Sequence, residues 1–134
     1  MQKFYQGNLK TDREESLKKP KGHEWLIGDF EKFNKTIRKT KLLELKYWEI
    51  KKGEEEKHKA KVQKSVGEIT ILLEGTTKGF IGEKDVTLKD GDYVYIPPGV
   101  ANNLVVEIIP ERIKGLTIKA PSDETDFIKI LRVK

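Results

Sequence analysis

The fold is decided by the stretch GDYVYIPPGVANNLVV, which spans residues 91–106. Gly91 turns the chain into the alternating run YVYI, and a double proline followed by Gly99 comes directly after this run. Proline lacks a backbone N–H and glycine tolerates positive φ, so these residues end one strand and turn the chain towards the next. We therefore expect strands at 93–99 and 103–109, on either side of a tight turn.

Apolar and polar residues alternate with a period of two on both sides of this stretch, and turn signals recur about every ten residues. This pattern is typical of an antiparallel all-β barrel or sandwich. Segment 30–40 is compatible with one helical turn or a loop, and segment 52–59 is expected to be a charged loop. Further strands are expected at 22–30, 41–51, 68–75, 80–88 (two short strands), 115–121 and 126–133.

The composition fits one domain. The chain has 134 residues, of which 36% are hydrophobic and 37% are charged, so it has enough apolar material for a core. Residues 1–21 are polar and are expected to form an N-terminal arm or lead-in, whereas residues 22–134 are expected to form the barrel domain. Cysteine is absent, which excludes disulfides, thiolate metal sites and cysteine nucleophiles.

The charge pattern argues against nucleic-acid and membrane partners. Of the 27 cationic residues 23 are lysines, and they are interleaved with acidic residues, so the net charge of +5 forms no basic stripe. No apolar run is long enough to span a membrane, and the N-terminal residues lack the apolar stretch of a signal peptide, so we expect a cytoplasmic protein. Abundant lysine and glutamate with few amides are typical of heat-adapted proteins.

The order of these features resembles the cupin superfamily, whose fold is a small jelly-roll β-barrel. The second cupin motif is G-x5-P-x-G-x2-H-x3-N, and its first glycine, proline and second glycine fall in register from Gly91 onwards. Asn102 stands where that motif has its histidine. The end of the first cupin motif, E-x6-G, is matched by Glu68 and Gly75. The resemblance covers about residues 22–122.

The resemblance implies that the usual metal ligands have been replaced. Cupins commonly hold a divalent metal with an H-x-H pair, a glutamate and a third histidine, a donor set that suits iron, manganese, nickel or zinc. Counting back from Glu68 places the H-x-H pair at Lys61 and Gln63. Only the glutamate then survives, and we expect neither a bound metal nor another cofactor.

Two other alignments of the first motif are possible. A spacing shorter by one residue places the H-x-H pair at Val62 and Lys64, where histidine is again absent. Counting forward from Gly53 brings His58 near the first ligand position, with Ala60 at the second. That choice leaves too many residues before the glutamate for one tight hairpin, so we prefer the first alignment.

The preferred alignment predicts a ligand-binding site made by Lys61, Gln63, Glu68 and Asn102. An inward carboxylate needs a partner, and the Lys61 ammonium can supply it, with the two amides as hydrogen-bonding neighbours. These groups could also merely satisfy one another as part of the core. The resemblance is stronger evidence for the fold than for an activity.

Three functions are compatible with this site. The first is a metal-free protein that binds a small polar molecule, such as a sugar or an organic acid. The second is an isomerase or lyase in which Lys61 and Glu68 form an acid–base pair. The third is a metal-dependent dioxygenase or isomerase, which requires the alignment through His58.

The resemblance also predicts a homodimer, because cupins commonly pair through strands or sheets. The apolar strand around Trp25–Ile27 is the expected interface. The aromatic side chains of Trp48, Tyr93 and Tyr95 are expected to pack inside the barrel.

Overall fold

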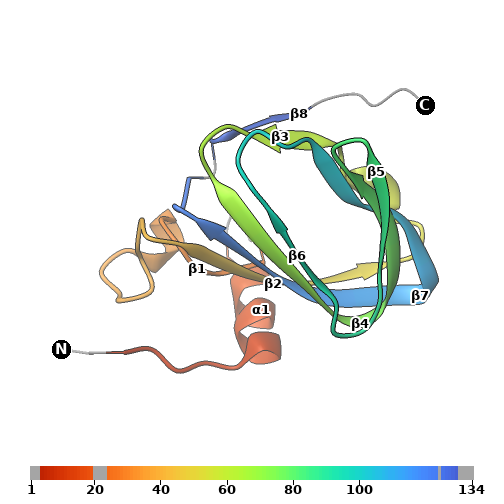
Figure 1. Cartoon of the computed structure of the whole chain (residues 1–134). Helices are drawn as coiled ribbons and strands as arrows, with labels where there is room; N and C mark the ends of the chain where they lie inside the picture. Colours follow the sequence, from red (N-terminus) through yellow and green to blue (C-terminus); the bar gives the residue numbers. More distant parts are fainter. Residues whose placement is uncertain (1–3, 20–23, 124, 130–134) are drawn as a thin grey trace.

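A computed structural model of the chain describes residues 4–19, 24–123 and 125–129, and its strands form the barrel in Figure 1. All strand pairs in the described residues are antiparallel. The elements, in chain order, are α1 (Leu9–Leu17), β1 (Trp25–Ile27), η1 (Glu31–Phe33), β2 (Glu44–Lys51), η2 (Glu55–Lys57), β3 (Lys61–Gln63), β4 (Gly67–Ile81), β5 (Lys84–Leu88), β6 (Tyr93–Ile96), β7 (Asn102–Ala120) and β8 (Phe127–Lys129).

Two long strands, β4 and β7, build the barrel because each takes part in both of its walls. The first half of β4 and the second half of β7 pair with each other, and β6 and β2 flank them, with β1 beyond β2. The second half of β4 and the first half of β7 also pair, and β5 and β3 flank them, with β8 beyond β3. The prediction of an all-β jelly-roll barrel is therefore confirmed.

The bend between the two walls explains where the predicted strand boundaries were wrong. Gly75 was expected to end its strand, but β4 continues through it with φ +95 and shifts its register to β7 on both sides. A side chain at Gly75 would lie 2.5 Å from the Arg112 carbonyl oxygen. Likewise, the strands expected at 103–109 and 115–121 form one strand, β7. A barrel corner needs a bend in each strand but no break in the hydrogen-bonded ladder.

The barrel interior changes from polar to apolar along its axis. Residues opposite one another on β2, β7 and β4 form lateral rows, and the successive rows are Glu44–Lys119–Glu68, Lys46–Thr117–Thr70, Trp48–Gly115–Leu72 and Ile50–Ile113. The apolar rows join Leu88, Val105 and Ile108 in one buried cluster. The polar rows lie inside the same barrel, so they require partners there.

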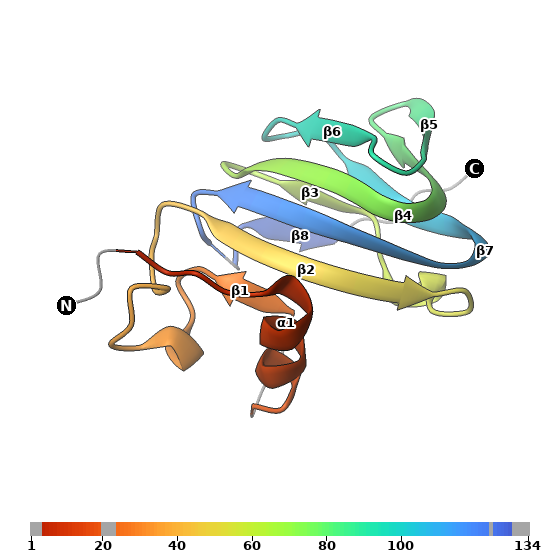
Figure 2. The ribbon, with the colours of Figure 1, turned by 90° about the horizontal axis from the view of Figure 1, so that it is seen from below.

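The N-terminal segment contains a helix that the sequence analysis did not anticipate. Asn8 caps α1 by accepting a hydrogen bond from the Thr11 backbone N–H at 3.0 Å. Figure 2 shows α1 beside β1 and β2, outside the barrel. The predicted boundary after residue 21 falls in 20–23, outside the described residues, as do residues 130–133 of the predicted last strand.

Beside α1, the segment around β1 is covered within the chain. Leu26 and Phe33 are buried, and Phe30 stacks on the Trp25 ring with 4.9 Å between the ring centroids. The segment 30–40, left open between a helical turn and a loop, contains the 3-10 turn η1. In the described residues, no helix is long and apolar enough to cross a membrane.

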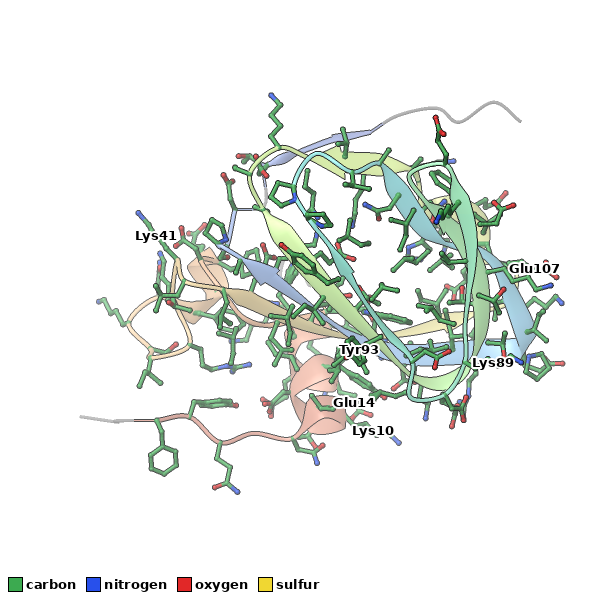
Figure 3. The ribbon with its side chains drawn as sticks, in the orientation of Figure 1. Lys10, Glu14, Lys41, Lys89, Tyr93 and Glu107 are labelled. Carbon is green, nitrogen blue, oxygen red and sulfur yellow. The ribbon has the colours of Figure 1, made fainter. Side chains whose placement is uncertain are left out.

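The outer surface carries both signs of charge, as the composition predicted. Figure 3 shows charged side chains that project from the outside of the molecule, among them Lys10, Glu14, Lys41, Lys89 and Glu107. Tyr93 and Tyr95, expected inside, are instead 71% and 62% exposed. They occupy alternate positions of β6 whose partners on β4, Ile71 and Ile69, also face outward.

We expect Gly115→Ala to lower the free energy of unfolding by about 2 kcal/mol, because it forces an overpacked core. A Cβ at this position would lie 2.2 Å from the Trp48 ring and 2.8 Å from the Ile71 carbonyl oxygen. Urea unfolding measures the change. Gly67→Ala is the matched control, because its Cβ meets only the exposed Tyr95 ring, at 3.3 Å. Equal losses in the two variants would contradict the packing of Trp48 across Gly115.

Candidate functional site

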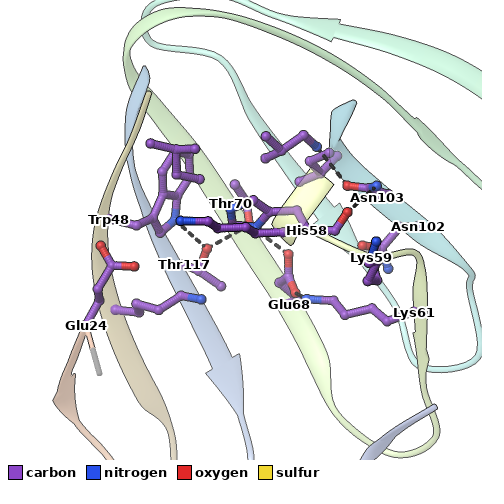
Figure 4. Close-up of a pocket in the computed structure, with 15 residues that line it drawn as sticks. Glu24, Trp48, His58, Lys59, Lys61, Glu68, Thr70, Asn102, Asn103 and Thr117 are labelled. Carbon is purple, nitrogen blue, oxygen red and sulfur yellow. Dashed lines mark hydrogen bonds and ion pairs between the residues drawn. The ribbon is translucent and has the colours of Figure 1, made fainter. Parts of the chain in front are cut away.

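A cavity of about 220 Å³ lies inside the barrel beside the polar rows. Figure 4 shows side chains from both walls converging on it. Its apolar side is formed by Trp48, Ile50, Leu104 and Val105. Its charged lining residues are Glu24, Lys46, Lys57, Lys59, Lys61 and Glu68.

Glu68 is the centre of the polar side of this cavity. Its carboxylate is buried, and Oε1 accepts from the Lys61 ammonium at 3.2 Å and from the Gln63 amide at 3.3 Å. Oε2 accepts from the Thr70 hydroxyl at 2.8 Å. Three of the four residues predicted to form the site are therefore in mutual contact. They meet because 61 and 63 project from the same face of β3, and Glu68 projects inward from β4.

A chain of hydroxyl groups extends from Glu68 to Trp48. The Trp48 indole N–H donates to Thr117 Oγ1 at 2.9 Å, and the two threonine hydroxyls lie 3.1 Å apart. Thr70 donates its proton to the carboxylate, so Thr117 must donate to Thr70. Neither threonine was among the site residues predicted from the sequence. Thr70 could have been predicted, because it lies two residues after Glu68 on β4 and therefore faces the same side of the strand. Thr117 could not, because only the register between β4 and β7 places it beside Thr70.

Asn102, the fourth predicted residue, lines the same cavity but has a different partner. Its amide donates to the Val100 carbonyl at 3.2 Å, and within the described residues it makes no hydrogen bond to Glu68. It stands opposite Lys61 in the β3–β7 pair. Its neighbour Asn103, which the sequence analysis missed, donates to the His58 carbonyl at 3.1 Å and ties the loop after η2 to the cavity.

The surroundings of Glu68 favour its ionised form. Burial by itself would raise the pKa of this carboxyl group. The ammonium groups of Lys61 and Lys119, together with the Thr70 hydrogen bond, outweigh burial and lower the pKa below its ordinary value of 4.5. Glu68 is therefore a carboxylate at neutral pH.

Two further lysines on the polar rows have no such partner. In the described part of the chain, no carboxylate oxygen lies within 4.0 Å of the Lys46 or Lys119 ammonium. Both ammonium groups lie near the Trp25 ring, at 4.9 and 5.7 Å from its centroid. Burial and the charge of Lys61 lower the pKa of Lys46, and the same two causes lower the pKa of Lys119 to about 8.

His58 lines the cavity from the loop before β3. Burial and the nearby charge of Lys46 lower its pKa, so the imidazole is neutral at pH 7. It ends η2 and precedes the strand that carries Lys61 and Gln63. Because these two β3 residues contact Glu68, the geometry favours the alignment through them over the alternative through His58 and Ala60.

The donor set of the cavity does not fit a transition metal. In the preferred alignment a cupin metal would use Glu68, and the ammonium of Lys61 and the neutral amides of Gln63 and Asn102 would stand in place of the imidazoles. An ammonium has no lone pair and repels a cation, and amides are poor ligands for these metals. Within residues 4–19, 24–123 and 125–129, no group of three histidine or acidic side chains is arranged to hold a metal ion.

Comparison with solved structures confirms the cupin fold. Streptomyces Pac13, solved with uridine and described as a nucleoside dehydratase, superposes with a TM-score of 0.57 and 9% identity over 71% of this chain and 73% of that chain. A Klebsiella pneumoniae protein with a double-stranded β-helix domain gives a TM-score of 0.54 and 17% identity, over 69% and 78% of the two chains.

An RmlC-like cupin family protein from Methanocaldococcus jannaschii gives a TM-score of 0.51 and 18% identity, over 62% of this chain and 73% of that chain. No family model and no curated protein sequence matches the chain. At these identities the similarity shows the fold alone.

We expect Lys61→Met to lower the free energy of unfolding by about 3 kcal/mol at pH 7, because it leaves the Glu68 carboxylate buried beside fewer cations. The double variant with Glu68→Gln should be less destabilised than the sum of the two single variants. Urea unfolding of the four proteins gives the coupling. Additive losses would mean that the two groups do not interact.

The same series has a defined pH dependence. The folded-state pKa of Glu68 is lower than its unfolded value, so its ionised form contributes stability above about pH 4.5 and loses it as the pH falls through the folded-state pKa. The destabilisation caused by Lys61→Met should therefore shrink in acid. A destabilisation that does not change with pH would contradict this assignment.

Proposed function

We propose that this cupin-fold protein binds a small carboxylic acid in its barrel cavity, without a metal ion. The balance of charge at the cavity carries this proposal. Four of the charged lining residues already have a partner of opposite charge. Glu68 pairs with Lys61. Glu24 pairs with Arg13 at 2.8 Å, and Lys57 pairs with Glu54 at 3.4 Å. Among the charged residues that line the cavity, this leaves Lys46 and Lys59 without a carboxylate partner in the described residues.

An anion is the ligand that this excess favours, since it can pair with the half-buried Lys46 and the exposed Lys59, which make no ion pair with a carboxylate of the described residues. Of the two ligand classes expected from the sequence, the organic acid therefore has more support than a neutral sugar. The volume of about 220 Å³ is below the range of drug-sized pockets, so the ligand is small. Asn102 and Asn103 offer amide groups for its polar substituents.

An enzyme that uses Lys61 and Glu68 as its acid–base pair has less support. General acid–base catalysis works best when the pKa of the catalytic group lies near the working pH. The 3.2 Å ion pair instead lowers the pKa of Glu68 and keeps it ionised. A pH–rate profile that collapses in Lys61→Met would revive this alternative.

We also propose that the protein forms a homodimer, through the outer face of β4 and β6. The expected interface around Trp25–Ile27 is unsuitable, because Leu26 is buried within the chain and Trp25 stacks on Phe30. The exposed apolar residues of this part of the sheet are Ile69, Leu73, Tyr93 and Tyr95. An uncharged face can meet its own copy about a two-fold axis without the repulsion that the net charge of +5 imposes elsewhere.

Small carboxylic acids are expected to raise the melting temperature of the wild-type protein, whereas a neutral polyol of similar size should leave it unchanged. Thermal shifts with lactate, malate and glycerol, each with and without EDTA, test the ligand class and the independence from metal. Lys59→Gln should weaken the shift, and the matched control Lys64→Gln, at an exposed lysine outside the cavity, should preserve it. A shift abolished by EDTA, or absent with every acid, would overturn the proposal.

Light scattering is expected to give a mass of twice the 15.5 kDa chain at micromolar concentration. Tyr95→Lys buries an unpaired charge in the proposed interface and should give the monomer. Leu42→Lys changes another large hydrophobic residue, which is 80% exposed outside this face, and it should remain dimeric. A monomeric wild-type protein, or a Tyr95→Lys variant that stays dimeric, would contradict this interface.

A further inference from the structure

Lys46 differs from the other lysine at the centre of the cavity. The Lys61 ammonium forms an ion pair with Glu68 Oε1 at 3.2 Å. No carboxylate oxygen of the described residues lies within 4.0 Å of the Lys46 ammonium. Lys46 projects inward from β2 in the row that holds Thr117 and Thr70, and it lines the cavity. Its ammonium lies 4.9 Å from the centroid of the Trp25 ring.

Both acidic and basic side chains, from several strands and loops, surround Lys46. The aromatic face of Trp25 and the carboxylates favour an ammonium, whereas burial and the neighbouring cations favour a neutral amine. Burial and then Lys61 have the largest effects, and the pKa of Lys46 is lowered. The charged and titratable neighbours are Glu44, Lys61, Glu68, Lys119, Glu24 and His58.

We propose that Lys46 is a nucleophilic amine that forms an imine with a carbonyl-bearing carboxylic acid, a 2-oxo acid, in this cavity. The inference rests on the proposed binding of small carboxylic acids and adds a covalent step to it. A lysine beside other cations and shielded from water is the arrangement that activates an amine towards a carbonyl group. Lys61 is less available for this role, because its nitrogen is engaged in the 3.2 Å ion pair with Glu68.

The step balances without an oxidant, a reductant or a metal. The Nζ lone pair of Lys46 forms a bond to the carbonyl carbon of the acid, and the carbonyl oxygen takes a proton to give a carbinolamine. The carbon–oxygen bond then breaks, and the oxygen leaves as water with the two hydrogens that the amine carried. The ligand carboxylate stays ionised throughout, and Lys59, the other lining lysine that makes no ion pair within the described residues, is the group that can bind it.

Borohydride trapping with pyruvate tests the proposal, because the reduced imine is a stable secondary amine. The wild-type protein, incubated with pyruvate and sodium cyanoborohydride, should gain one adduct per chain, which peptide mapping assigns to Lys46. Lys46→Arg keeps the positive charge but cannot form the imine, and it should lose at least ten-fold in adduct yield. Lys64→Met, the matched control at an exposed lysine outside the cavity, should react like the wild type.

Lactate separates this inference from the function on which it rests, because it is a carboxylic acid without a carbonyl group that an amine can capture. If lactate raises the melting temperature but pyruvate gives no adduct on Lys46, the imine is overturned and the acid-binding proposal stands. If lactate, malate and pyruvate all fail to bind, both are overturned. Adducts spread evenly over exposed lysines of the wild-type protein also overturn the inference, and this result does not depend on the folding of any variant.

Discussion

The pairing of β4 with β7 is the constraint on which both the barrel and its cavity depend. These strands pass through both walls, and they remain paired on each side of the bend at Gly75. Their register sets Glu68 opposite Lys119 and Thr70 opposite Thr117. A slip of one residue would turn every one of these side chains to the other face, so the register that closes the barrel also assembles the polar site.

The buried carboxylate of Glu68 needs groups around it that compensate its negative charge. Cupins commonly balance such a group with a metal ion, whereas this chain uses an ammonium, an amide and a hydroxyl. The exchange has a chemical consequence, because the groups that contact Glu68 supply hydrogen-bond donors and one ammonium in place of a Lewis acid. Lys46 lines the same cavity, makes no ion pair with a carboxylate of the described residues, and has its pKa lowered by burial and by the charge of Lys61.

The sequence predicted the parts of this arrangement that local pattern controls. Alternation located most of the strands, and motif spacing brought Lys61 and Gln63 to Glu68. It could not predict Thr117, Lys46 or Lys119, because their positions depend on lateral register between strands distant in sequence. It missed α1, whose residues LKTDREESL are polar nearly all round. Tyr93 and Tyr95 were misplaced because alternation defines two faces of a strand without saying which faces the core.

The placement of the two tryptophans gives the protein a built-in optical reporter. They are the only tryptophans in the chain, and both belong to the cavity's surroundings: Trp48 lines it, and the ring of Trp25 lies against the Lys46 ammonium. Indole emission responds to nearby charge and to hydrogen bonding at its N–H. A change in charge at Lys46 alters the surroundings of Trp25 directly, because the two groups are in contact. A change at Glu68 alters the hydrogen bond of the Trp48 N–H, because Thr117 and Thr70 connect that N–H to the carboxylate. The intrinsic fluorescence of the unlabelled protein thus reports on the cavity, with no contribution from tryptophan elsewhere.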